Sequence, residues 1–144
     1  METSGDLIVP SEKPVIDNGK LRTFKTGATR DTAEGKIDPE AFLDPQVVVE
    51  FCRYMNRHRV QSDGSLREGD NWQKGFTRES IAKSMQRHNL DFWLMHRGFE
   101  PESSDHLKVF KEQNKERAMI EALCGIYFNA AAYMREVLIQ RSLQ

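Results

Sequence analysis

The sequence has few cysteines and no long uninterrupted apolar run. Cys52 and Cys124 lie within apolar stretches rather than at the spacings of a disulfide framework, which is typical of buried thiols in a reducing compartment. The most apolar stretch, 118–134, contains Glu121 and Asn129 and is shorter than the ~20 residues that cross a bilayer. The first residues lack the basic and apolar segments of a signal peptide. We therefore expect a cytoplasmic protein that has no membrane partner.

An excess of charge of one sign is also absent. The chain has 21 Lys and Arg against 22 Asp and Glu, so no overall field attracts nucleic acid or an anionic membrane. It contains no G-x-x-x-x-G-K loop, no C-x-x-C pair and no G-x-S-x-G elbow. These absences argue against a phosphate-binding P-loop, a structural zinc site and acyl transfer. Any phosphate ligand must be held by local side chains.

The 144 residues are sufficient for one domain, and 38% of them are hydrophobic, which can fill a modest core. Residues 1–40 contain three of the five prolines, few apolar residues and no periodicity, so we predict an extended N-terminal arm there. This arm either is disordered or completes a site. Residues 41–144 are predicted to form one all-α domain, a helical bundle.

Three helices are predicted from capping and apolar spacing. The first, at about 45–59, follows an Asp-Pro start, and the second runs from Thr77 to Gly98. A long loop separates them. The third, at about 115–140, is apolar nearly all round, so it should be central or lie in a subunit interface. We expect a homo-oligomer, either a homodimer or a homotetramer, and one short helix within the charged stretch 101–117.

Polar residues occupy positions that have core spacing in the second predicted helix. Ser84, His88 and Asp91 follow the same stripe as its apolar residues. Burying a carboxylate and an imidazole costs several kcal/mol unless they are paired or ligated. One interpretation is a hydrogen bond between His88 and Asp91, which are one turn apart. The other is a metal or phosphate site.

The other two predicted helices each add a carboxylate. Glu121 and Asn129 are the strongly polar residues within the apolar part of the third helix, where a lone glutamate should be ligated or protonated. Glu50 lies one turn from Arg53, and an exposed ion pair is the simple interpretation. Together with Asp91, these carboxylates would suit Mg²⁺ or Mn²⁺. Such an ion can bind a polyphosphate and activate water.

Three further residues would fit a nucleotide. Lys74 and Arg87 can clamp phosphate oxygens, and Trp72 can stack on a base. The simple alternative is that the tryptophan belongs to the core and that the basic side chains are solvated.

Five short motifs occur in order over about residues 24–137. They are Phe24-x-Thr26-Gly27-Ala28-x-Arg30-Asp31-x-x-x-Gly35-Lys36, Asn71-Trp72-x-Lys74-Gly75, Ser84-x-x-Arg87-His88, Glu121-Ala122-Leu123-Cys124 and Phe128-Asn129. With these motifs the chain resembles the phage dATP/dGTP diphosphohydrolases, relatives of the MazG-type all-α nucleoside triphosphate pyrophosphatases. The resemblance implies a MazG-like bundle in phage nucleotide metabolism, acting in the host cytoplasm.

The resemblance also implies a reaction and a site. A purine nucleoside triphosphate, dGTP or GTP first and dATP as a further candidate, would be cut between the α and β phosphates with Mg²⁺ or Mn²⁺. The metal ligands would be Glu50, Asp91 and Glu121. The catalytic residues would be His88, Asp91 and Glu121. The substrate-binding residues would be Arg30, Lys36, Asn71, Trp72, Lys74, Arg87 and Asn129.

The sequence departs from the MazG pattern in its acidic motifs. MazG proteins have Glu-x-x-Glu and Glu-x-x-Asp, whereas this chain has His88-x-x-Asp91 and Glu121-x-x-Cys124. One alternative is therefore a non-catalytic bundle that binds a nucleotide or a partner protein. Another is a small zinc protein that uses His88, Asp91, His96 and Cys124. Base and sugar preference stay open, because they depend on a few hydrogen bonds placed by tertiary structure.

Overall fold

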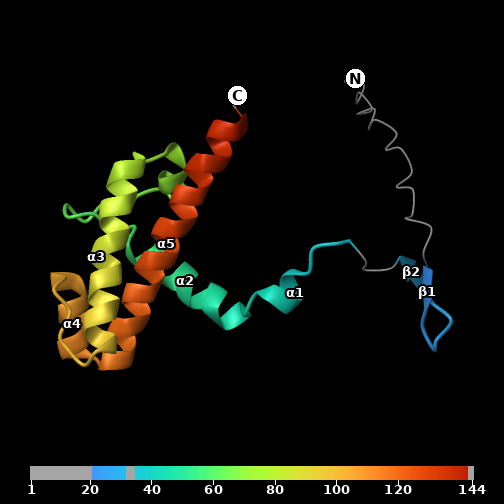
Figure 1. The fold of residues 1–144 in the computed structure, drawn as a ribbon, viewed down its shortest axis with the longest axis horizontal. Coiled ribbons are helices and arrows are strands. Elements are labelled where there is room, and N and C mark those ends of the chain that lie inside the picture. Colours follow the sequence, from blue (N-terminus) through green and yellow to red (C-terminus); the bar gives the residue numbers. More distant parts are fainter. Residues whose placement is uncertain (1–20, 32–34, 143–144) are drawn as a thin grey trace, which may run out of the picture. The chain divides into compact units, whose positions relative to one another are not determined.

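The computed structural model describes residues 21–31 and 35–142, and the chain divides into two units, one ending at Phe42 and one beginning at Leu43 (Figure 1). The first unit contains β1 (Leu21–Thr23), β2 (Thr29–Asp31) and the short helix α1 (Pro39–Phe42). The strands form an antiparallel hairpin whose turn includes Gly27, at a φ of 88°. The hairpin lies within the predicted extended arm and gives no signal in the sequence, because three-residue strands are too short to show alternation. The predicted arm residues 1–20 lie outside the described part.

The second unit opens with α2 (Pro45–Arg57), which begins where the sequence predicted. The Asp44 side chain accepts a hydrogen bond from the Gln46 backbone N–H at 2.8 Å, so it caps the helix. A long loop follows, as expected. It contains a bridge between Val60 and Leu66 and a 3₁₀ helix, η1 (Asn71–Lys74).

Three further helices complete this unit: α3 (Arg78–His96), α4 (Ser104–Glu112) and α5 (Lys115–Ser142). Thr77 caps α3, and Gly98 follows its end at a φ of 86°. The all-α prediction is confirmed for the described residues of this unit. None of the helices in the described ranges combines the length and apolar character that a membrane span requires.

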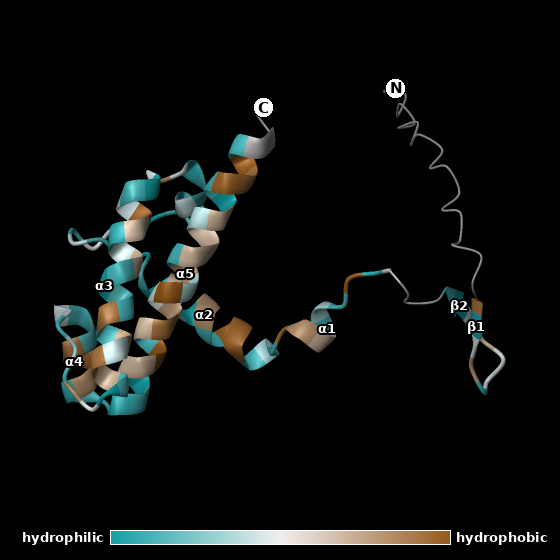
Figure 2. Ribbon diagram, viewed as in Figure 1, coloured by the Kyte–Doolittle hydropathy of each residue, from teal (hydrophilic) through white to brown (hydrophobic). Residues whose placement is uncertain are grey.

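Helix α5 is central, because it packs against α2, α3 and α4. Ala118, Ala122 and Ala132 on α5 are buried, so the neighbouring helices approach it closely. A different face of α5 is uncovered in the single chain. Figure 2 shows apolar residues along α5. Four large side chains of this helix, Leu123, Tyr127, Met134 and Leu138, are 45–62% exposed.

Candidate functional site

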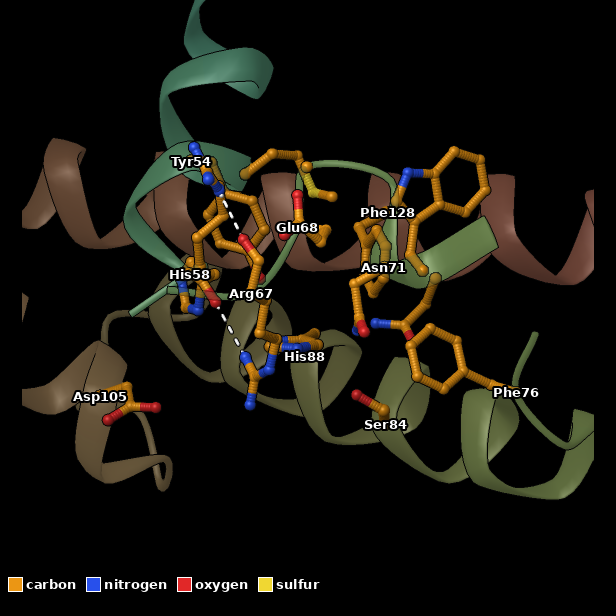
Figure 3. A pocket seen from close by; sticks show the side chains of 15 residues that line it. Tyr54, His58, Arg67, Glu68, Asn71, Phe76, Ser84, His88, Asp105 and Phe128 are labelled. Atoms are coloured by element: carbon orange, nitrogen blue, oxygen red, sulfur yellow. Dashed lines mark hydrogen bonds between the residues drawn. The ribbon is translucent and has the colours of Figure 1, made fainter. Parts of the chain in front are cut away.

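A cavity of about 400 Å³ opens between α2, α3, α5 and the loop that carries η1 (Figure 3). Its size lies in the usual range for small-molecule sites. Figure 3 shows His58 and Asp105 at one end and Phe76 and Phe128 at the other. The cavity therefore has one mainly polar end and one aromatic end.

The aromatic end is built by η1 and α5. The ring of Phe128 meets Trp72 at 6.3 Å and Phe76 at 6.4 Å between centroids, both in edge-to-face geometry. Arg135 lies 5.7 Å from the Trp72 ring, in a cation–π contact. Asn71, at the start of η1, also lines the cavity. This end offers flat apolar surfaces with polar groups beside them.

The polar end carries basic and acidic side chains, and its two arginines are held by hydrogen bonds to backbone carbonyls. Arg67 Nη1 donates to the His58 carbonyl at 2.9 Å, and Arg59 Nε donates to the Arg67 carbonyl at 2.8 Å. His58, Arg59 and Arg67 all line the cavity, together with the carboxylates of Glu68 and Asp105. Sequence reasoning missed both arginines. Their only signal in the sequence was that both lie in or beside the long loop after α2. The sequence did not reveal that this loop folds back onto α2.

Glu121 lies behind His58, within a cluster of basic groups. Its carboxylate contacts Arg57, lies 3.6 Å from His58 Nε2 and lies 3.4 Å from Arg117 Nη2. Burial raises the pKa of Glu121, but the hydrogen bond with His58 and the charge of Arg57 outweigh burial and hold the pKa below its usual value. Glu121 is therefore ionised and paired with basic side chains rather than protonated.

Glu50 shares one partner with Glu121. Arg117 Nη1 donates to Glu50 at 3.0 Å while its Nη2 faces Glu121, so the two carboxylates lie on the same guanidinium. The expected pair with Arg53 is present at 2.8 Å. Hydrogen bonds from Arg117 and then Arg53 lower the pKa of Glu50. Two of the three predicted carboxylates are thus neighbours.

Asp91 has a different environment from the one expected. Its Oδ1 accepts from the backbone N–H groups of Glu102 at 2.8 Å and Ser103 at 3.1 Å, and its Oδ2 lies 2.7 Å from His106 Nδ1. The predicted hydrogen bond from His88 is therefore wrong, because the α3–α4 connection turns back and supplies the partners. At 1% exposure, Asp91 is buried and anchors the start of α4.

The predicted three-carboxylate set is not assembled. In residues 21–31 and 35–142, no three His, Cys, Asp or Glu side chains are grouped so that they could hold a metal ion. This also applies to the alternative zinc set of His88, Asp91, His96 and Cys124. Asp91 does not fit a metal ligand, since both of its oxygens are engaged. The oxygens of Glu50 and Glu121 are engaged as well, but their arginine partners are partly exposed side chains rather than backbone groups, and Mg²⁺ is commonly held by one or two carboxylates together with substrate phosphates.

His88 lines the cavity and packs against α5 at Gly125. A Cβ atom at position 125 would come within 2.6 Å of His88 Nδ1, so only glycine leaves room for the ring. Nδ1 is buried without a hydrogen-bond partner, and the ring lies 5.0 Å from that of His106. Burial and then the proximity of His106 lower the pKa of His88 to about 4. His88 is therefore neutral at neutral pH.

This shift predicts a pH-dependent stability. Between pH 6.5 and about 4 the unfolded chain binds a proton at His88 that the native state does not, so the free energy of unfolding falls as the pH falls through this window. Allowing for partial solvent contact, we expect a loss of about 1–2 kcal/mol. Urea unfolding of the wild type and His88→Leu at several pH values measures it. His88→Leu should have the shallower slope, and equal slopes would contradict the assignment. His96→Leu, at an exposed histidine of α3, is the control.

The other predicted site residues divide into three sets. Trp72, Asn71 and Asn129 line the cavity, as predicted for substrate contacts. Lys74 and Arg87 are exposed and do not line it. The predicted arm residues Arg30 and Lys36 belong to the first unit, in which a separate cavity is lined by Arg22, Arg30, Asp31 and Lys36.

These contacts explain which of the predicted residues share a site. Asn71 and Trp72 in the loop and Asn129 on α5 meet at the cavity. The carboxylate of Asp91 instead accepts its hydrogen bonds at the start of α4 and contacts His106. Family models, curated proteins and solved structures were compared with the chain, and none of them matches it. Its function is therefore inferred from the cavity, the Glu121 cluster and the motifs.

Proposed function

We propose that the protein hydrolyses purine nucleoside triphosphates to the monophosphate and pyrophosphate, with dGTP or GTP as the first candidates and dATP as a further one. The observation that carries the proposal is the cavity of about 400 Å³, which combines an aromatic end with the two arginines Arg59 and Arg67. A nucleotide has the matching parts, a flat base and an anionic tail. The motif order of the phage dATP/dGTP diphosphohydrolases supports the same reaction, in phage nucleotide metabolism in the host cytoplasm.

The described side chains suggest one orientation for the substrate. The base would lie against Trp72, Phe76 and Phe128, since stacking on aromatic rings suits any purine. The phosphates would then lie toward Arg59 and Arg67. Arginine is suited to this task because its planar guanidinium can form two parallel hydrogen bonds to phosphate oxygens.

In this proposal Glu121 acts on water from behind His58, since it does not line the cavity itself. Its lowered pKa keeps it ionised, so it can accept a proton or orient a water molecule through a hydrogen bond. His58 connects this carboxylate to the cavity, since it lines the cavity and lies 3.6 Å from Glu121. The basic groups around Glu121 would stabilise the charge that develops on the leaving pyrophosphate.

Mg²⁺ or Mn²⁺ would be held by Glu50 and Glu121 together with the substrate. Both carboxylates face Arg117, whose side chain is 25% exposed, so the ion would have to displace this guanidinium. When bound, the ion supplies charge for the phosphates and lowers the pKa of a bound water. Asp91 has no part in this proposal.

The experiment is a pyrophosphate-release assay with Mg²⁺ or Mn²⁺ across dGTP, GTP, dATP, ATP and the pyrimidine triphosphates, with products identified by chromatography. Purine monophosphate and pyrophosphate in equal amounts are expected, and EDTA should stop their release. Release of orthophosphate, or no release from any nucleotide, would contradict the proposal.

A second candidate is a nucleotide-binding bundle without catalysis. It is favoured by the pairing of Glu121 with Arg57 and Arg117, which leaves its charge compensated before any ion binds. Calorimetry separates the two candidates. Nucleotide binding without pyrophosphate release under any divalent cation would select the second one.

We also propose a homo-oligomer, dimer or tetramer, formed through the uncovered face of α5. Leu123, Tyr127, Met134 and Leu138 recur at helical spacing on this face and are exposed in the single chain. Met134→Glu would place a charge in the interface, so light scattering should show subunits separating. Gln140→Glu, at an exposed polar position of the same helix, is the charge-matched control. A wild-type protein that is monomeric at micromolar concentration would contradict this proposal.

A further inference from the structure

Asn129 is a buried amide on the wall of the cavity. It is 3% exposed and lies on α5, directly after Phe128. Its Nδ2 donates to the carbonyl oxygen of Gly125 at 2.7 Å, one turn earlier on the helix. This bond fixes the orientation of the amide, because only the nitrogen can donate. The oxygen Oδ1 is therefore the atom left for another partner.

Oδ1 is open to the cavity. In the described ranges, His88 Nδ1 is the one buried side-chain polar atom that has no hydrogen-bond partner. Oδ1 of Asn129 forms no hydrogen bond with the described residues, and yet it is not such a buried atom without a partner. Oδ1 is therefore accessible to a molecule in the cavity. A molecule in the cavity can therefore donate a hydrogen bond to this oxygen.

The surroundings of Asn129 indicate the kind of donor. The adjacent Phe128 ring meets Trp72 and Phe76, so a flat ring held at this end of the cavity would present its edge near the amide. His88, which packs against Gly125, is neutral at neutral pH, so no cation competes from that side. A neutral N–H group on the edge of a planar ring matches a neutral amide oxygen.

We infer that Asn129 Oδ1 accepts a hydrogen bond from the exocyclic amino group of a purine, and that the cavity thereby selects amino-bearing bases. This inference rests on the proposed nucleotide site and names its specificity-determining residue. The donor would be N2–H of guanine or N6–H of adenine. A base without the amino group would leave the buried acceptor unpaired, which costs roughly tenfold to a hundredfold in affinity.

The test is calorimetry with triphosphates made resistant to hydrolysis by an α,β-methylene group. Two pairs of bases each differ by one amino group, namely guanine against hypoxanthine and adenine against unsubstituted purine. In the wild type, loss of the amino group should weaken binding at least tenfold in one pair, which also tells N2 from N6. In Asn129→Leu that ratio should fall to within about twofold. Asn89→Leu, at an exposed position of α3, should keep the wild-type ratio.

A merely structural role for Asn129 would weaken all analogues equally and leave the ratio unchanged, which would overturn the inference. Asn129→Asp is the second variant, because it keeps an oxygen acceptor and loses the donor to Gly125. It should keep the ratio even if Asn129→Leu does not fold, and loss of the ratio in Asn129→Asp would count against the inference. Tight binding without amino preference would overturn this inference alone. No binding of any nucleotide would overturn the proposed function with it.

Discussion

Asp91→Ala should lower the free energy of unfolding by about 3–5 kcal/mol, because it removes one partner of a buried, hydrogen-bonded charge. The substitution leaves His106 and the backbone N–H groups of Glu102 and Ser103 without their acceptor, within a region where Asp91 itself is 1% exposed. Urea unfolding followed by circular dichroism measures the change. Because Asp91 holds the start of α4, proteolysis near residue 102 should also become faster.

Two further variants separate the contributions of Asp91. Asp91→Asn keeps an oxygen for the backbone N–H groups, so it should cost less than Asp91→Ala. His106→Ala leaves the buried carboxylate without its side-chain partner, and the double variant Asp91→Asn with His106→Ala should cost less than the sum of the single ones. If Asp91→Asn were as stable as the wild type yet inactive, Asp91 would be a catalytic residue, as the sequence alone predicted.

Glu121→Gln should lower kcat for pyrophosphate release by 10²-fold or more, a typical loss when a group that handles a proton is removed. Glutamine keeps the shape and an oxygen that Arg57 can contact, but it removes the charge that makes Glu121 a base. We expect the free energy of unfolding to fall by only about 1–2 kcal/mol. Steady-state kinetics and urea unfolding of the same preparation measure the two effects.

Glu116→Gln is the matched control for Glu121, because Glu116 is an exposed glutamate in the first turn of the same helix. It should leave kcat unchanged. Full activity of Glu121→Gln would remove Glu121 from the mechanism. Loss of activity together with loss of folding would instead assign it a structural role within the cluster of Arg57 and Arg117.

Local sequence signals predicted the helices well. Asp44 and Thr77 cap their helices through hydrogen bonds to backbone N–H groups two or three residues away, and Gly98 adopts a positive φ just beyond α3. Such interactions depend on neighbours in the chain, so the sequence reveals them directly. The hairpin around Gly27 is local as well, but its strands are too short to be recognised.

The candidate site was predicted only in part. Core spacing on α3 correctly indicated that Asp91 is buried, and the apolar surroundings of Glu121 and Asn129 on α5 correctly indicated the same for them. Spacing did not reveal their partners. His88 was the nearest candidate for Asp91 along α3, whereas the actual partner, His106, comes from α4.

The sequence by itself determined where α2, α3 and α5 begin and that Asp91, Glu121 and Asn129 are buried, because both depend on the pattern of residues close by in the chain. Only the tertiary structure decided the partners of these side chains. Glu121 meets Arg57 across 64 positions of the chain, and His88 fits because Gly125 on another helix has no side chain. Contacts of this kind depend on how helices pack, and the spacing of residues along one helix does not contain that information.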